Sequence, residues 1–167
     1  VNNLEKLSLS GISSKFPSIG RDLYVTPGCS ISIQGNGYKI VGWEVKSQVK
    51  EQQEYDFYMN EAREEYEVLQ DWLIQREIYY QVLTSETATA EEKEEARAKY
   101  SDVQIIKTCE VKSDEKKIKV MKNRPITPIW LENLEHFSSN NHYYADYPHR
   151  EKVLKLYNRL SEKQKES

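Results

Sequence analysis

The sequence has no glycine after Gly42, although its first 42 residues contain all six. Glycine permits tight turns and close backbone approaches, so we expect these features only in the front part of the chain. The chain also has no run of about 18 apolar residues, and its first ten residues lack the basic start and apolar stretch of a secretory signal. We therefore expect a soluble, intracellular protein without membrane contact.

Cysteine is scarce as well. Only Cys29 and Cys109 occur, and neither belongs to a Cys-x-x-Cys pair. Two cysteines are too few for a disulfide framework, so we predict two free thiols on strands. Apolar residues make up 38% of the 167 residues, below the roughly 45–50% of globular chains. This composition predicts one domain over residues 1–167, with a small core and an elongated shape.

Motifs for nucleophilic catalysis and phosphate binding are absent, since the chain contains neither Gly-x-Ser-x-Gly nor Gly-x-x-x-x-Gly-Lys. Four potential metal ligands gather near the C-terminal end: His136, His142, Asp146 and His149. Their spacing matches no closed zinc pattern, and no cysteine is near them in the sequence. We therefore predict no enzymatic activity, no metal site and no cofactor.

Two β-hairpins are predicted from alternating apolar and polar residues. The first covers residues 29–46, with Asn36-Gly37 as a type I′ turn. The second covers residues 103–122, where β-branched residues precede a turn at residues 113–115 and a strand whose outer face is lysine. Together the two hairpins would form one small antiparallel sheet or an open barrel.

The end of the first hairpin carries Glu44 and Lys46 around one valine. A strand ending in Glu-x-Lys resembles the metal-binding edge of the PD-(D/E)xK nuclease family, in which a carboxylate of the neighbouring strand completes the site. Here the predicted neighbouring strand offers only Ser30, Ser32 and Gln34. Because Mg²⁺ prefers clustered oxygen ligands, a lone glutamate is a poor site, and a metal-dependent nuclease is the least favoured function.

The middle of the chain has helical periodicity. Residues 50–84 predict one long amphipathic helix, whose C-terminal half we expect to be buried because apolar residues surround it after Ile74. Thr89 and Glu92 have the spacing of a capping box and predict the start of a second, mostly exposed helix. These helices predict a protruding arm over residues 50–101.

Two short helices are predicted near the C-terminus, because Thr127-Pro128 has the pattern of a helix start and Pro148 opens another helical stretch. The fold class is therefore α+β. Its predicted parts are a first hairpin (29–49), an inserted acidic helical arm (50–101), a second hairpin (102–124) and C-terminal helices (125–163).

Negative charge is concentrated in this arm. Residues 50–100 contain 14 acidic and 6 basic residues, whereas the segments before and after it are net positive. Few of these carboxylates have an oppositely charged residue four positions away, so the arm is predicted to present free acid to a basic partner protein. The expected function is that of a non-catalytic accessory subunit, adaptor or inhibitor. The candidate contact residues are Tyr55, Tyr58, Glu61, Glu64, Glu65, Tyr66, Glu67 and Asp71.

Two alternatives remain open for the charged segments. The acidic face could serve only to keep the protein soluble. Residues 107–124 are net positive by four, which gives the alternative of a nucleic-acid-binding module. Its candidate contacts are Lys112, Lys116, Lys117, Lys119, Lys122 and Arg124.

Overall fold

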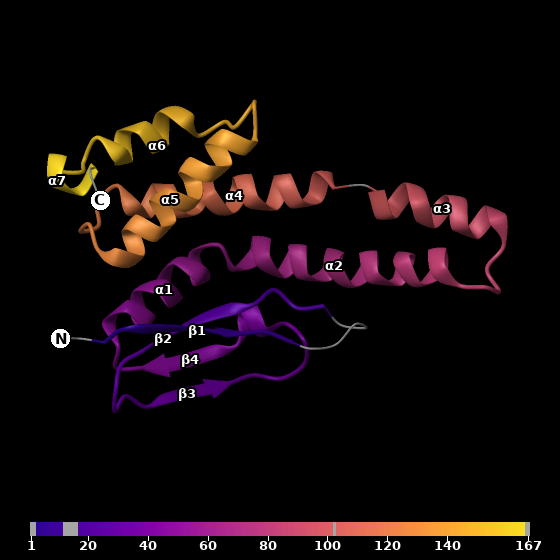
Figure 1. The fold of residues 1–167 in the computed structure, drawn as a ribbon, viewed down its shortest axis with the longest axis horizontal. Helices are drawn as coiled ribbons and strands as arrows, with labels where there is room; N and C mark the ends of the chain where they lie inside the picture. The colour runs from indigo at the N-terminus through magenta and orange to yellow at the C-terminus, as the bar shows by residue number, and fades with distance from the viewer. Residues whose placement is uncertain (1–2, 12–16, 102, 166–167) are drawn as a thin grey trace.

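The computed structural model of the chain describes residues 3–11, 17–101 and 103–165. The described part is α+β, as predicted, with the helices in the majority (Figure 1). In chain order the elements are β1 (Glu5–Leu9), β2 (Arg21–Val25), β3 (Ile31–Gln34), the 3₁₀ turn η1 (Ile40–Gly42), β4 (Glu44–Ser47), α1 (Lys50–Glu61), α2 (Arg63–Thr84), α3 (Ala90–Ser101), α4 (Gln104–Met121), α5 (Pro128–Tyr143), α6 (Arg150–Tyr157) and α7 (Glu162–Lys165).

The strands form two separate antiparallel hairpins, β1–β2 and β3–β4. The second of these confirms the hairpin predicted over residues 29–46, but Asn36-Gly37 is not its two-residue turn. The strand pairing ends at Gln34 and Glu44, so residues 35–43 form a longer loop that includes η1. Only the glycine of the Asn36-Gly37 pair has a positive φ, of 69°. The hairpin β1–β2 was not predicted.

The prediction of a second hairpin over residues 103–122 is wrong, because this segment is helix α4. Lysine and apolar residues alternate in its second half, which is why it resembles a strand. The helical spacing of Asp114, Ile118 and Met121 decides the structure, because it places all three fully buried side chains on one face. Tertiary packing thus overrides the strand propensity of the valines and isoleucines. Among the described residues no barrel is formed.

The predicted long helix is interrupted at Ala62, whose φ of −107° and ψ of 17° separate α1 from α2. Ala62 is fully buried. The break changes the direction of the chain: α1 lies across the hairpins, whereas α2 runs alongside α4 and continues to the far end of the molecule (Figure 1).

The core lies where α1, α4, α5 and α6 meet. Trp130 and Phe137 of α5 are completely buried there, and the Trp130 indole N–H donates to the backbone oxygen of Met121 at 3.1 Å. The predicted start of this helix is confirmed, since the Thr127 side chain accepts a hydrogen bond from the backbone N–H of Trp130. The predicted last helix is present as α6, followed by the short α7.

Two smaller predictions concern the cysteines and the membrane. Both cysteines are free, as predicted, but neither is on a strand: Cys29 lies in the loop before β3, and Cys109 is buried in α4. Burial raises the pKa of the Cys109 thiol. Within residues 3–11, 17–101 and 103–165, no helix combines the length and the apolar character that crossing a bilayer requires.

Replacing Gly35 with alanine should destabilise the β3–β4 hairpin. A Cβ atom at Gly35 would lie 2.2 Å from Cγ of Trp43, so the indole would have to move. Overpacking of this kind typically costs about 1–3 kcal/mol. Gly20→Ala is the control, because the nearest atom to its Cβ lies at an ordinary 3.4 Å. Urea unfolding measures both variants, and equal midpoints would contradict the contact between Gly35 and Trp43.

Candidate functional site

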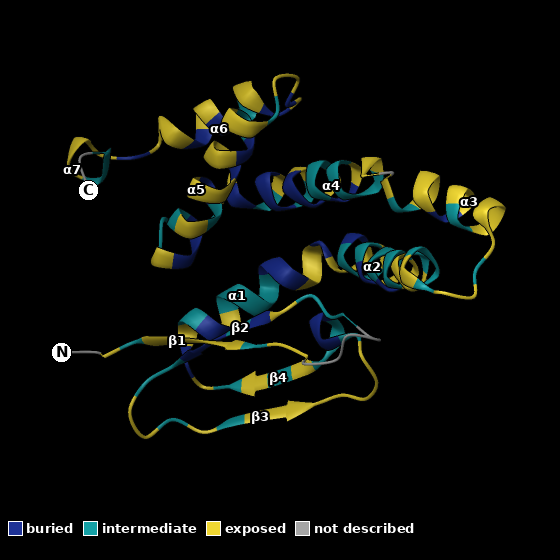
Figure 2. Ribbon diagram, turned by 45° about the vertical axis from the view of Figure 1, so that its right-hand side comes forward, coloured by how far each residue is buried: buried dark blue, intermediate teal, exposed yellow. Residues whose placement is uncertain are grey.

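The outer half of the helical arm takes almost no part in the core. We call residues 75–101 the distal arm; it comprises the end of α2, the following loop and α3. Its only buried residue is Ala96, and it contributes none of the residues of the main hydrophobic cluster. Figure 2 shows α3 as mostly exposed, at the end of the molecule away from α6 and α7. The distal arm therefore contributes surface rather than core.

The expectation that the C-terminal half of α2 is buried is wrong. Ile78 and Tyr80 are 44% and 47% exposed. The reason lies in α3, which has no large aliphatic side chain and covers only part of α2. The apolar side chains on all sides of this half of α2 therefore have too little apolar surface to pack against, and several remain accessible to solvent.

The local sequence explains why α3 forms at all. Its predicted capping box is confirmed: the backbone N–H of Thr89 donates to the Glu92 carboxylate at 2.7 Å, and the backbone N–H of Glu92 donates to the Thr89 hydroxyl at 3.2 Å. The bond from the Thr89 backbone is also the main reason why the pKa of Glu92 is lowered. The charged carboxylate thus holds the start of α3 in place.

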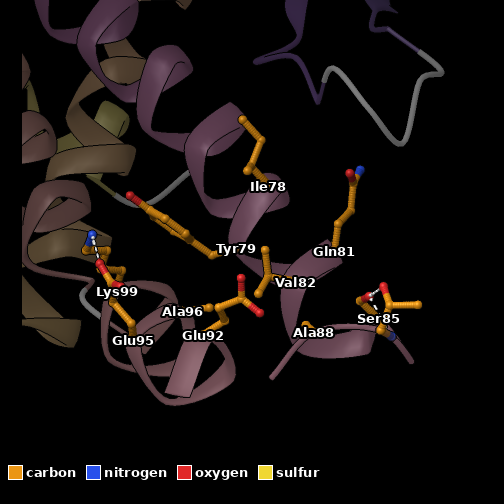
Figure 3. A pocket seen from close by; sticks show the side chains of 11 residues that line it. Ile78, Tyr79, Gln81, Val82, Ser85, Ala88, Glu92, Glu95, Ala96 and Lys99 are labelled. Carbon is orange, nitrogen blue, oxygen red and sulfur yellow. Dashed lines mark hydrogen bonds and ion pairs between the residues drawn. The ribbon is translucent and has the colours of Figure 1, made fainter. Parts of the chain in front are cut away.

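A groove of about 580 Å³ lies between the end of α2 and α3 (Figure 3). Its apolar lining comes from Ile78, Tyr79 and Val82 of α2 and from Ala96 of α3. The remaining lining residues are Gln81, Ser85, Thr87, Ala88, Glu92, Glu95 and Lys99. It lies where α2 and α3 pack against each other.

Carboxylates dominate the charge around this groove. Glu92 and Glu95 line it from α3, and its only basic residue, Lys99, is paired with Glu95 at 2.7 Å. The distal arm as a whole has six acidic and four basic residues. One of these bases, Arg76, stacks on Tyr100 at 4.4 Å and does not line the groove. The groove therefore has a mixed lining, in which apolar side chains of α2 face two carboxylates and one lysine of α3.

The contact candidates chosen from the sequence lie nearer the body. Tyr58 is 1% exposed. The Tyr55 hydroxyl accepts a hydrogen bond from the backbone N–H of Asp22 at 3.1 Å. Burial raises the pKa of each tyrosine to about 12. The Tyr66 hydroxyl accepts from Lys117 at 2.6 Å. These aromatic rings pack within the protein.

Most of the acidic candidates have partners, contrary to the expectation of free carboxylates. Glu64 and Glu65 both lie 2.9 Å from the ammonium group of Lys116 on α4. Glu67 pairs with Arg63 of its own helix, and Asp71 pairs with Lys39 of the hairpin loop, each at 2.8 Å. Glu61 is exposed. Sequence spacing could not reveal the long-range pairs, because they join residues from different elements.

The alternative nucleic-acid candidates divide into two groups. Lys116 and Lys117 point toward α2, and the Arg124 guanidinium stacks on Phe57 at 3.9 Å, so these three have internal partners. Lys112 and Lys119 of α4 and its C-cap Lys122 are exposed. The basic segment therefore keeps an exposed face, but on a helix instead of a hairpin.

The remaining candidates from the sequence show no metal-like arrangement. His136 lies 3.4 Å from Asp114, His149 contacts the backbone oxygen of Val111, and Asp146 pairs with Lys107. The strand residue opposite Glu44 is Gln34 and the one opposite Lys46 is Ser32, so β3 places no carboxylate directly opposite Glu44. Across the described part of the chain, no three histidine, cysteine or carboxylate side chains lie close enough together to hold a metal ion.

Comparisons of this chain with protein-family models, with curated proteins and with solved structures find no match. The site is therefore defined by geometry, and the geometry points to residues that the sequence analysis passed over. Ile78, Tyr79 and Val82 were assigned to the interior. One feature of the sequence could have shown that these residues are accessible: α3 has no apolar stripe that could cover them.

Lys116→Met should lower stability by about 1–2 kcal/mol, because Glu65 is 9% exposed and would lose the cation beside it. Lys112→Met is the matched control on the same helix, with an exposed side chain and no ion pair recorded among the described residues. Guanidinium unfolding compares the two variants. If both unfold at the wild-type midpoint, the ion pairs do not hold α2 against α4.

Proposed function

We propose that the protein is a non-catalytic interaction protein that binds a basic amphipathic helix of a partner protein in the groove of the distal arm. The observation that carries the proposal is that residues 75–101 project beyond the core, contain one buried residue and contribute none to the main hydrophobic cluster. A segment with no packing role and an accessible apolar groove is typical of a contact surface.

The shape of the groove favours a helical partner. Two packed helices form its walls, and amphipathic helices commonly place one apolar face in such grooves. Ile78, Tyr79 and Val82 supply apolar and aromatic contact area from α2. Tyrosine is a common anchor at interfaces, because it has large area and few rotatable bonds.

The charge of the groove favours a basic partner. Glu92 and Glu95 line it from α3, and the other acidic residues of the distal arm are Glu77, Glu86, Glu91 and Glu94. Lysine or arginine residues flanking the apolar face of a partner helix would meet these carboxylates. Complementary charge of this kind mainly raises the association rate and selects against acidic partners.

The proposed contact residues lie in the distal arm, whereas the candidates chosen from the sequence lie on α1 and the first half of α2. Glu64, Glu65 and Asp71 are already engaged by lysines of this chain, and Tyr58 is inaccessible. Reversing these charges would disturb the ion pairs of α2 and would not be a clean test of binding.

Ile78→Asp should abolish binding of a synthetic helical peptide that has leucines on one face and lysines on the other. The change places a carboxylate in the apolar lining. Val68→Asp is the matched control, because Val68 is 49% exposed on the same helix but lies outside the groove, while Ile78 is 44% exposed. Fluorescence anisotropy of the labelled peptide measures both, with circular dichroism to check folding.

A peptide with glutamate in place of every lysine tests the charge requirement. Binding of the lysine peptide by wild type and Val68→Asp, but not by Ile78→Asp, supports the groove. Equal binding of the lysine and glutamate peptides, or equal effects of the two variants, would contradict the proposal.

A further inference from the structure

Helix α6 lies beside α4, at the end of the molecule away from α3 (Figure 1). The surface on which these two helices adjoin carries five lysines. We call this surface the lysine face. Its members are Lys112 and Lys119 of α4, Lys122 at the C-cap of that helix, and Lys152 and Lys155 of α6. The proposed function does not use any of them.

Helical spacing places Lys112, Lys119 and Lys122 on one side of α4 and its C-terminal end. Positions 112, 115, 119 and 122 follow each other at intervals of three and four residues, and all four are exposed. The opposite side of α4 holds Ile118 and Met121 in the core. From Lys112 to Lys122 the helix rises about 15 Å, from roughly 1.5 Å per residue.

Helix α6 adds two lysines beside this row. Lys152 bridges to Glu115 of α4 at 3.0 Å, which fixes the side of α6 that faces the row. Lys155 lies one turn further along the same side and is exposed. Val153 and Leu156 anchor α6 in the core, so the helix is held rigidly against its neighbours.

Glu115 lies between cations of both helices, because Lys152 of α6 pairs with it and Lys119 follows it by one turn of α4. The pKa of Glu115 is lowered, chiefly by Lys152, with smaller contributions from His149 and Lys119. Glu115 is the one acidic residue within the row, and Glu151 lies at its edge on α6. Five lysines against two carboxylates leave the lysine face positive, although the whole chain has a net charge of −3.

We propose that the lysine face binds the phosphate backbone of a nucleic acid. Exposed lysines in a row neutralise phosphates and release counterions without reading bases. The large exposed apolar side chains of α6, Leu154 and Tyr157, occupy other positions around the helix and leave the lysine face without an apolar anchor. A protein interface or an inserted membrane anchor would need such an anchor, whereas a phosphate backbone does not.

The test measures binding of labelled duplex DNA by fluorescence anisotropy, using the full chain. Wild type should bind in about 50 mM salt and weaken steeply towards 200 mM, because counterion release is salt-dependent. Lys119→Glu with Lys155→Glu should weaken binding about tenfold or more. Lys46→Glu with Lys50→Glu is the matched control, since Lys46 of β4 and Lys50 at the start of α1 are both exposed and the change in charge is identical. This control should bind like wild type within about threefold.

Each other outcome overturns the proposal. No salt-dependent binding, or equal losses in the two double variants, would mean that the lysine face does not contact phosphate. Binding to vesicles of anionic lipid but not to DNA would assign the face to a membrane surface. Self-association that is abolished by Lys119→Glu with Lys155→Glu, without DNA binding, would assign it to a second copy of this chain. Peptide binding by the distal arm is measured separately, so this proposal can fail without the other.

Discussion

The arrangement of the front half depends on one buried guanidinium. Arg21 of β2 is 2% exposed, and it donates to the backbone oxygens of Val41 and Trp43 at 2.8 and 2.9 Å and to Asp56 of α1 at 2.5 Å. Gln52 completes the junction, because it donates to Asp56 and accepts from the backbone of β2. One side chain thus joins a hairpin, a loop and a helix. Removing one partner would leave buried polar groups unpaired, which is strongly destabilising.

Charge has two different roles along the helical arm. Near the body, Glu64 and Glu65 pair with Lys116, and Asp71 pairs with Lys39. These pairs hold α2 against α4 and the hairpin loop, so these carboxylates mainly stabilise the fold. Beyond Ile74 the core ends, and the carboxylates surround an accessible groove. The lysine face lies at the other end of the molecule. Acidic and basic surfaces are thereby separated along the long axis of the molecule (Figure 1).

The sequence predicted elements whose signals are local: the α+β class, the β3–β4 hairpin, the capping box of α3 and the start of α5. It failed where tertiary contacts decide. Residues 103–122 alternate like a strand, yet Ile118 and Met121 need the helical period to reach the core. Apolar residues around the end of α2 suggested burial, but α3 lacks the side chains to cover them. The role of Arg21 was not visible, because its partners come from distant segments.

Residue-resolved hydrogen exchange, with and without the lysine-bearing helical peptide, tests the central claim most directly. The account predicts that amides of residues 75–101 exchange through local opening, faster than those of the core helices α4 and α5, because the distal arm has few buried contacts. Peptide should then slow exchange in residues 75–101 and leave the core unchanged. Exchange of the whole chain as one cooperative unit, or protection that appears in α4 and α6 instead, would contradict the account.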